Sequence, residues 1–237
     1  MLSRSAIQGL SMLAVLLLVS NSARALVIDD FSSGPLSLLV TNLTGQTVLQ
    51  SGLSTSSVIG GKRSVYVGSV IGNAMGEIDS AAGQFNFGTD TNAFGYFKLT
   101  YGSTNSPLGL NLTSSGIDRF QIKITELAPG PFFGIFNVNL ETGSGWKNYS
   151  FGQEVSQLGV PGALSLPFTK FTGSDLTRVR AIQIDVGRFS PASFISIDSI
   201  TTIPEPATTG IIALSFILSF ALRSRNLTRT TSSRPLL

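Results

Sequence analysis

The chain contains no cysteine and no histidine among its 237 residues. Without cysteine it has no disulfide framework and no thiol to carry a lipid. Without either residue type it also lacks the Ser-His-Asp and Cys-His nucleophile systems and the usual zinc ligands. These absences exclude several classes of hydrolase and metalloprotein, and they leave either carboxylate chemistry or a role without catalysis.

Charged residues are also scarce, at 12% of the chain, and the excess of positive over negative charge lies at the two ends. Residues 26–203 contain 10 Lys and Arg against 12 Asp and Glu, a net charge of −2, although the whole chain has a net charge of +3. The central region therefore has no basic patch of the kind that binds nucleic acid, and we expect no nucleic-acid partner.

The first 25 residues have the order of a secretory signal peptide. Arg4 supplies the positive start, residues 10–19 are apolar, and Ala23-Arg24-Ala25 is a small-x-small cleavage site. The alternative is an uncleaved anchor, but the apolar part is short for a membrane span. We expect export and cleavage after Ala25.

A second targeting segment, residues 204–237, closes the chain. Pro204 and Pro206 restrict the backbone and hold Glu205 in an extended segment. The uncharged residues 207–222 follow, long enough for roughly 24 Å of helix. The basic residues Arg223 and Arg225 come next and fit a stop-transfer signal on the cytoplasmic side. We expect a short transmembrane helix that holds the chain in the membrane; the alternative is a C-terminal core helix.

This order of motif, apolar run and arginines resembles the PEP-CTERM sorting domain of bacterial exported proteins. The resemblance covers only about residues 202–229, and the basic cluster is looser and the tail longer than is usual. It implies that a membrane-embedded exosortase is a partner, that the chain is cleaved near Pro204-Glu205-Pro206, and that the product is released or attached at the cell surface.

Residues 26–203 favour strands, because they are rich in Gly, Ser, Thr, Phe, Ile and Val. Apolar and polar residues alternate in 120–125, 136–140, 182–186 and 195–198, and turn signals such as Gly60-Gly61 and Gly143-Ser144-Gly145 separate the runs. Many short strands of this kind predict an all-β fold, one antiparallel β-sandwich of jelly-roll type.

The opening Asp29-Asp30-Phe31 and the closing Ile197-Asp198-Ser199-Ile200 are similar to strands of the galactose-binding-like jelly rolls. That loose resemblance implies a sandwich of about nine strands with its termini in one region, often with a carbohydrate-binding role. Such domains can hold a structural Ca²⁺ near the first and last strands. Asp29, Asp30 and Asp198 supply suitable oxygens; the alternative is that they cap turns.

Two sets of residues suggest an activity for the sandwich. Trp146 and Tyr149 follow a glycine turn and could stack on a sugar from a loop, or else pack over the sandwich rim. A carboxylate pair could cleave glycosides, and the candidate pairs are Glu77 with Asp79 and Glu126 with Glu141, although solvated strand ends explain them equally simply.

We therefore expect a non-enzymatic, exported surface or matrix protein that exosortase sorts. Extracellular polysaccharide is a possible partner. The alternatives are an active carbohydrate-binding module and, behind it, a carboxylate glycosidase.

Overall fold

A computed structural model describes residues 25–127, 135–151 and 162–204 of the chain. The predicted signal peptide up to residue 24 and the sorting segment from Glu205 onward, with Pro206, Arg223 and Arg225, lie outside these residues. In the part that is described, no helix is long and apolar enough to cross a membrane.

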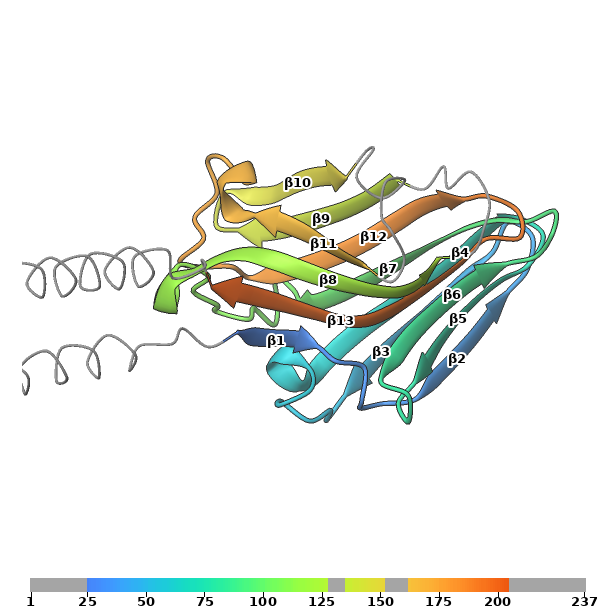
Figure 1. Ribbon diagram of the computed structural model, residues 1–237, viewed down its shortest axis with the longest axis horizontal. Helices are drawn as coiled ribbons and strands as arrows, with labels where there is room; N and C mark the ends of the chain where they lie inside the picture. Colours follow the sequence, from blue (N-terminus) through green and yellow to red (C-terminus); the bar gives the residue numbers. More distant parts are fainter. Residues whose placement is uncertain (1–24, 128–134, 152–161, 205–237) are drawn as a thin grey trace, which may run out of the picture. The chain divides into compact units, whose positions relative to one another are not determined.

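The described residues form two antiparallel sheets that pack face to face, so the predicted all-β sandwich is confirmed, with thirteen described strands instead of the expected nine or so (Figure 1). The seven-stranded sheet has the order β11-β8-β13-β6-β5-β2, and β1 also pairs with β13. Its strands are β1 (Leu26–Asp29), β2 (Leu36–Val40), β5 (Ala74–Asp79), β6 (Gln84–Thr89), β8 (Ile117–Leu127), β11 (Gly162–Pro167) and β13 (Phe194–Pro204).

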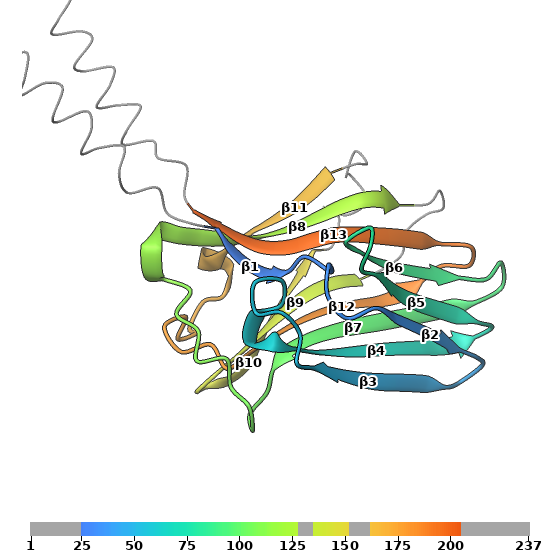
Figure 2. The ribbon, with the colours of Figure 1, turned by 90° about the horizontal axis from the view of Figure 1, so that it is seen from below.

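The six-stranded sheet has the order β10-β9-β12-β7-β4-β3. Its strands are β3 (Gly45–Ser51), β4 (Lys62–Ile71), β7 (Phe94–Gly102), β9 (Ile135–Thr142), β10 (Gly145–Phe151) and β12 (Ala181–Phe189). Figure 2 shows β3, β4 and β7 side by side at one margin of the molecule. Three short 3₁₀ turns, η1 (Ile59–Gly61), η2 (Ser114–Gly116) and η3 (Phe168–Lys170), lie in the connections.

The core follows from the alternation in the sequence, because every second side chain of a strand points to the same face. Phe120, Ile122 and Ile124 of β8 are buried, as are Ile182 and Ile184 of β12. Phenylalanines fill the centre: the rings of Phe85 and Phe97 lie 4.8 Å apart, and those of Phe87 and Phe189 lie 4.7 Å apart. Such tilted ring pairs add to the free energy gained by burial.

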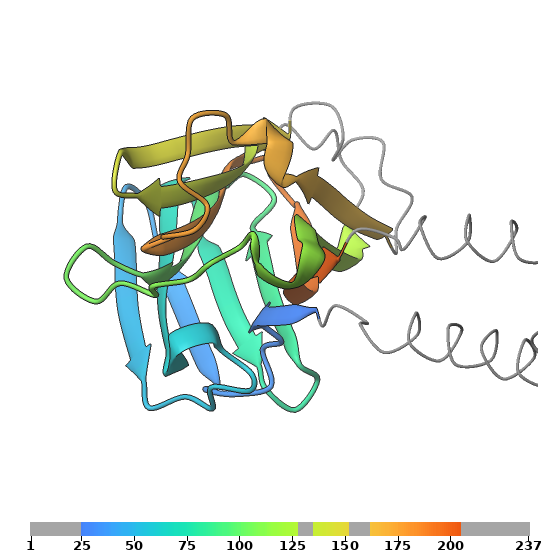
Figure 3. The ribbon, with the colours of Figure 1, turned by 90° about the vertical axis from the view of Figure 1, so that its left-hand side faces the viewer.

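Strand β13 joins the two ends of the domain. One of its edges pairs with β8, and its other edge pairs first with β6 and then with β1, where Leu26 lies opposite Thr202. Figure 3 shows the blue β1 beside the end of the orange-red β13. The first and the last described strands are therefore neighbours, as the resemblance to the galactose-binding-like domains implies.

Candidate functional site

The outer face of the six-stranded sheet is built from hydroxyl and amide side chains. Residues that lie opposite each other across a ladder share a face, so the register defines rows across the sheet. One row runs through Asn148, Asn139, Gln183, Thr100 and Ser64. The next row runs through Ser150, Asn137, Asp185, Lys98 and Tyr66. We call these ten residues the polar face.

Side-chain hydrogen bonds connect the polar face across four strands, β10, β9, β12 and β7. The Nδ2 of Asn148 donates to Oδ1 of Asn139 at 2.6 Å, and Nδ2 of Asn139 donates to Oδ2 of Asp185 at 2.6 Å. Nε2 of Gln183 donates to Oγ1 of Thr100 at 3.2 Å. Amides that are held in this way keep fixed donors and acceptors on a surface that is partly open to solvent.

Tyr66 of the polar face lies beside a second tyrosine, Tyr96. The hydroxyl groups of Tyr66 on β4 and Tyr96 on β7 are 2.9 Å apart, and their ring centroids are 5.4 Å apart. The hydrogen bond to Tyr96 is the main cause that raises the pKa of Tyr66 above its ordinary value. The two rings therefore present a pair of hydrogen-bonded hydroxyl groups on this face.

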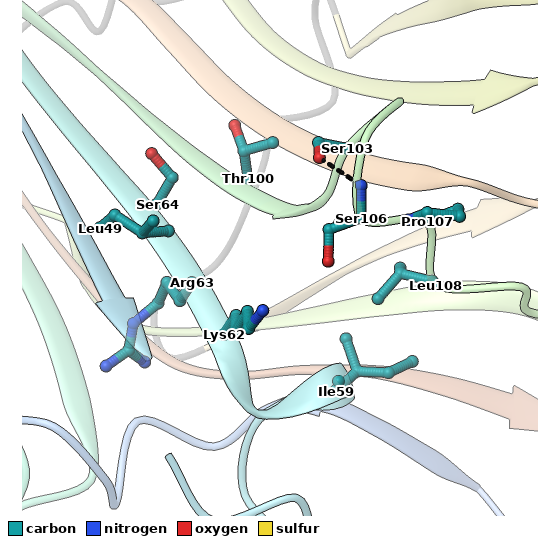
Figure 4. Close-up of a pocket in the computed structure, with 12 residues that line it drawn as sticks. Leu49, Ile59, Lys62, Arg63, Ser64, Thr100, Ser103, Ser106, Pro107 and Leu108 are labelled. Carbon is teal, nitrogen blue, oxygen red and sulfur yellow. Dashed lines mark hydrogen bonds between the residues drawn. The ribbon is translucent and has the colours of Figure 1, made fainter. Parts of the chain in front are cut away.

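A cavity of about 460 Å³ lies over β3, β4 and β7 at one end of the polar face. Ser64 and Thr100 belong to both the cavity and the polar face, and Figure 4 shows them near Leu49. The loop after β7 forms another wall, where the backbone N–H of Ser106 donates to Oγ of Ser103 at 3.0 Å. The remaining lining residues are Ile59, Gly60, Lys62, Arg63, Gly102, Pro107 and Leu108. The volume suits a small molecule or one residue of a polymer.

Of the two alternatives that the sequence leaves open for Trp146 and Tyr149, the structure does not form the aromatic pair on a loop. Trp146 and Tyr149 lie in strand β10, three residues apart, so their side chains point to opposite faces. Trp146 is 49% exposed and shares the outer face with the polar face, opposite Glu141. The ring of Tyr149 packs edge-on against Phe151 at 5.3 Å, with Nζ of Lys170 5.7 Å from its centroid. Trp146 alone is placed to contact a ligand on this face.

The predicted calcium ligands face different partners. Asp29 is fully buried and binds Nη1 of Arg63 through Oδ1 at 2.8 Å and Oδ2 at 2.6 Å. Asp30 accepts hydrogen bonds from Ser32, and Asp198 accepts one from Nζ of Lys123 at 2.9 Å. In the described ranges, no three acidic side chains come together as a metal site. Calcium binding at these residues stays a prediction, and Asp29 would have to release Arg63 to take part.

The buried pair of Asp29 and Arg63 has further partners inside the sandwich. Tyr101 donates to Oδ2 of Asp29 at 2.9 Å, and the backbone N–H of Phe31 donates to Oδ1 at 2.8 Å. Arg63 donates to the backbone oxygen of Ser33 at 2.8 Å and to Oε1 of Gln50 at 2.8 Å. Burial raises the pKa of Tyr101 well above its ordinary value, and Asp29 adds to that rise. We call Asp29, Arg63 and Tyr101 the buried cluster.

The carboxylates proposed for glycoside cleavage have other surroundings. Glu126 lies on β8 of the seven-stranded sheet and Glu141 lies on β9 of the other sheet, where Oε1 of Glu141 accepts a hydrogen bond from Thr104 at 2.7 Å. Glu77 and Asp79 lie on one strand, and Asp79 caps the turn after it by accepting from the N–H groups of Ala81 and Ala82. None of these four carboxylates lines the cavity over β3, β4 and β7.

Only the edges of the predicted targeting segments fall within the described residues. Ala25 is exposed and directly precedes β1, and Pro204 is the last residue of β13, opposite Ile117. Sequence reasoning missed the polar face, although the signal was present: Gln183 with Asp185, and Asn137 with Asn139, are the polar partners in two of the alternating runs.

No protein-family model matches the chain, and no curated protein sequence is significantly similar to it. Among solved structures, it is similar to a family 11 carbohydrate-binding module of a cellulosomal cellulase of Clostridium thermocellum, at 16% identity and a TM-score of 0.37, over 78% of this chain and 96% of that one. A second structure of a family 11 module from that organism, in complex with a mixed-linked tetrasaccharide, gives 14% identity and a TM-score of 0.37, over 77% and 97%.

A family 61 module in complex with β-1,4-galactotriose gives 12% identity and a TM-score of 0.34, over 71% of this chain and 88% of that one. Because these TM-scores are below 0.5 and the identities are low, the ligands of those proteins do not transfer to this chain.

Proposed function

We propose that the sandwich is a non-catalytic module that binds a polysaccharide on the polar face. The observation that carries this proposal is the row from Asn148 to Ser64, which is hydrogen-bonded as far as Thr100 and ends in the cavity beside Leu49. A polysaccharide presents alternating hydroxyl donors and acceptors along a chain. Fixed amides and hydroxyls can match such a ligand, since each amide offers both donors and an acceptor.

Trp146 and the two tyrosines extend this surface. The exposed indole of Trp146, on β10, can stack on the apolar face of a sugar ring. Tyr66 and Tyr96 supply hydroxyl groups on the same outer face, farther along the sheet on β4 and β7. The uncharged character of most of the polar face favours a neutral polymer, because Asp185 already accepts hydrogen bonds from Asn137 and Asn139.

Affinity electrophoresis of the full chain in gels containing different polysaccharides tests the proposal. Gln183→Ala removes the amide at the centre of the row, and we expect it to weaken binding by about tenfold, the equivalent of one net hydrogen bond. Asn86→Ala is the matched control, because Asn86 is an amide on the outer face of the other sheet. Equal retardation of wild type and Gln183→Ala on every polymer would reject the polar face as the site.

We further propose that exosortase sorts this module to the cell surface or the extracellular matrix. The support is the order of Pro204-Glu205-Pro206, the apolar residues 207–222 and the arginines after them. Glu205→Ala removes the only charge of the motif and leaves the apolar run intact. We expect this variant to accumulate as a longer, membrane-bound form, whereas wild type is shortened; immunoblots of fractionated host cells distinguish the two, and normal processing of the variant would refute sorting through the motif.

A further inference from the structure

Strand β2 forms an edge of the seven-stranded sheet and carries neither of two usual protections of an edge, charge and proline. Its sequence, Leu36-Ser37-Leu38-Leu39-Val40, contains no charge and no proline, and its pairing in the sheet is with β5 on one side. Figure 1 shows β2 at the lower margin of the sandwich. Sheet edges are normally blunted by charge, proline or bulges, because their free N–H and C=O groups can pair with another chain.

The other described edge strands differ from β2 in composition. Strand β10 carries Lys147, β11 ends in Pro167, and β3 is mostly polar with the sequence Gly-Gln-Thr-Val-Leu-Gln-Ser. Strand β3 also carries neither charge nor proline, so β2 is distinguished by its apolar content: four of its five residues are apolar, against two of seven in β3.

Exposed apolar side chains continue from β2 across the outer face of its sheet. The register aligns Leu39 with Met75, Gly88 and Phe194 in one row. Leu39 is 64% exposed and Met75 is 42% exposed, and a groove of about 310 Å³ runs along this row. Gly88 lies between Met75 and Phe194 and has no side chain, which leaves the groove open. An exposed apolar row of this kind marks an interaction surface.

We propose that β2 pairs antiparallel with β2 of a second copy of this chain, so that two seven-stranded sheets join into one. A symmetric pairing centred on Leu38 places Leu36 opposite Val40 and Ser37 opposite Leu39 of the second copy. The apolar inner sides of the two strands then meet, and the two Leu39 side chains become diagonal neighbours on the outer face. Diagonal neighbours are within reach of long side chains, so the apolar rows of both copies join.

The charges near β2 are compatible with this arrangement. Within one copy, Glu77 lies opposite Ser37 and Met75 lies opposite Leu39. In the symmetric pairing Ser37 lies opposite Leu39 of the second copy, so the row that starts at Glu77 continues to the Met75 of the second copy. The two Glu77 side chains are therefore not placed opposite each other. A twofold contact must be self-complementary, and an uncharged five-residue strand meets that requirement. Because the strand is short, we expect a reversible dimer rather than a permanent one.

Cross-linking of the full chain in mild detergent tests the pairing, and the natural absence of cysteine makes each introduced thiol unique. L39C places a thiol at the proposed contact. L49C is the matched control, since Leu49 is 69% exposed and lies on β3, the edge strand of the other sheet. With a short bismaleimide, we expect about ten times more cross-linked dimer from L39C than from L49C, because pairing raises the effective concentration of the two thiols.

A second variant tests the same contact without a cross-linker. Leu39→Lys puts a charge on the edge, and we expect it to shift the molecular mass in light scattering from dimer to monomer, whereas Leu49→Lys leaves the dimer intact. Equal cross-linking of L39C and L49C, or a wild-type chain that is monomeric at every concentration at which L39C is tested, would overturn the proposal. A partner other than this chain at β2 would give that monomeric result.

Discussion

The molecule contains two polar networks, one buried between the sheets and one on the outer face, and they differ in whether their side chains can exchange water for a ligand. The buried cluster of Asp29, Arg63 and Tyr101 is charged, and all three side chains are fully buried. The polar face is mostly neutral, and its amides remain partly open to solvent. A network closed to water can only hold the fold together, whereas one at the surface can trade water for a ligand at little cost in stability.

The largest effect is expected when the buried cluster loses its cation. Arg63→Leu leaves Asp29 buried without its partner, and we expect the free energy of unfolding to fall by about 3–5 kcal/mol. Denaturant unfolding measures this loss. Arg180→Leu is the control, because Arg180 binds the backbone oxygen of Thr104 in an exposed position. The double variant Asp29→Leu, Arg63→Leu should lose less than the two single losses added together, because the cost lies in the orphaned charge; simple additivity would show that the two charges act independently.

Tyr101→Phe tests the same cluster through pH. The folded protein holds the phenolic proton above the ordinary pKa of 10.0 because burial raises the pKa of Tyr101. The contribution of this group to stability is complete below pH 10 and is lost as the pH rises through the folded pKa. We expect the variant to lose about 1.5–3 kcal/mol at neutral pH, the range for a hydrogen bond to a charged group.

Above pH 10 the unfolding free energy of Tyr101→Phe should decline less steeply than that of wild type. Thermal unfolding followed between pH 7 and about pH 11 records both slopes. Parallel slopes would mean that Tyr101 is ionised to the same extent in the folded and unfolded chains.

The smallest effect on stability is expected on the polar face. Asn139→Ala removes hydrogen bonds to Asp185 and Gln183, yet water can replace them, so we expect a change within about 0.5 kcal/mol. The same variant should bind more weakly to any polysaccharide that retards the wild-type chain, as we expect for Gln183→Ala. A stability loss close to that of Arg63→Leu would show that the outer network also holds the fold.

The sequence identified many of the strands in which burial alternates, such as β8, but it missed β5 and β11, whose burial also alternates, and the mostly exposed β3 and β10. The alternation of Phe120, Ile122 and Ile124 is strict, and β8 is present as expected. Strands β3 and β10 are edge strands with mostly exposed residues, so packing imposes no apolar period on them. Of the two alternatives for Trp146 and Tyr149, the loop pair is therefore not formed, whereas Tyr149 packs against Phe151.

The buried cluster and the polar face could each be predicted from the sequence only in part. Arg63, Val65 and Val67 are alternate residues of β4, so their side chains point to the same inner face, and this spacing predicts a buried cation at the start of the strand. Its partner Asp29 lies 34 residues away, and no local pattern gives that distance. To predict the polar face, one would need the register of five strands. Pairing between distant strands is set by tertiary packing rather than by any single segment.

The position of β13 has a consequence for the order of folding. β13 lies between β8 on one edge and β6 and β1 on the other, and it is the last described strand of the chain, while its neighbour β1 is the first. The hydrogen bond from Leu26 to Thr202 spans 176 residues. A domain with such a high contact order folds slowly, because the cost of loop closure precedes the gain from pairing. During synthesis the seven-stranded sheet cannot close until β13 is available, so the strands that pair with it, β1, β6 and β8, stay open to chaperones and proteases until then.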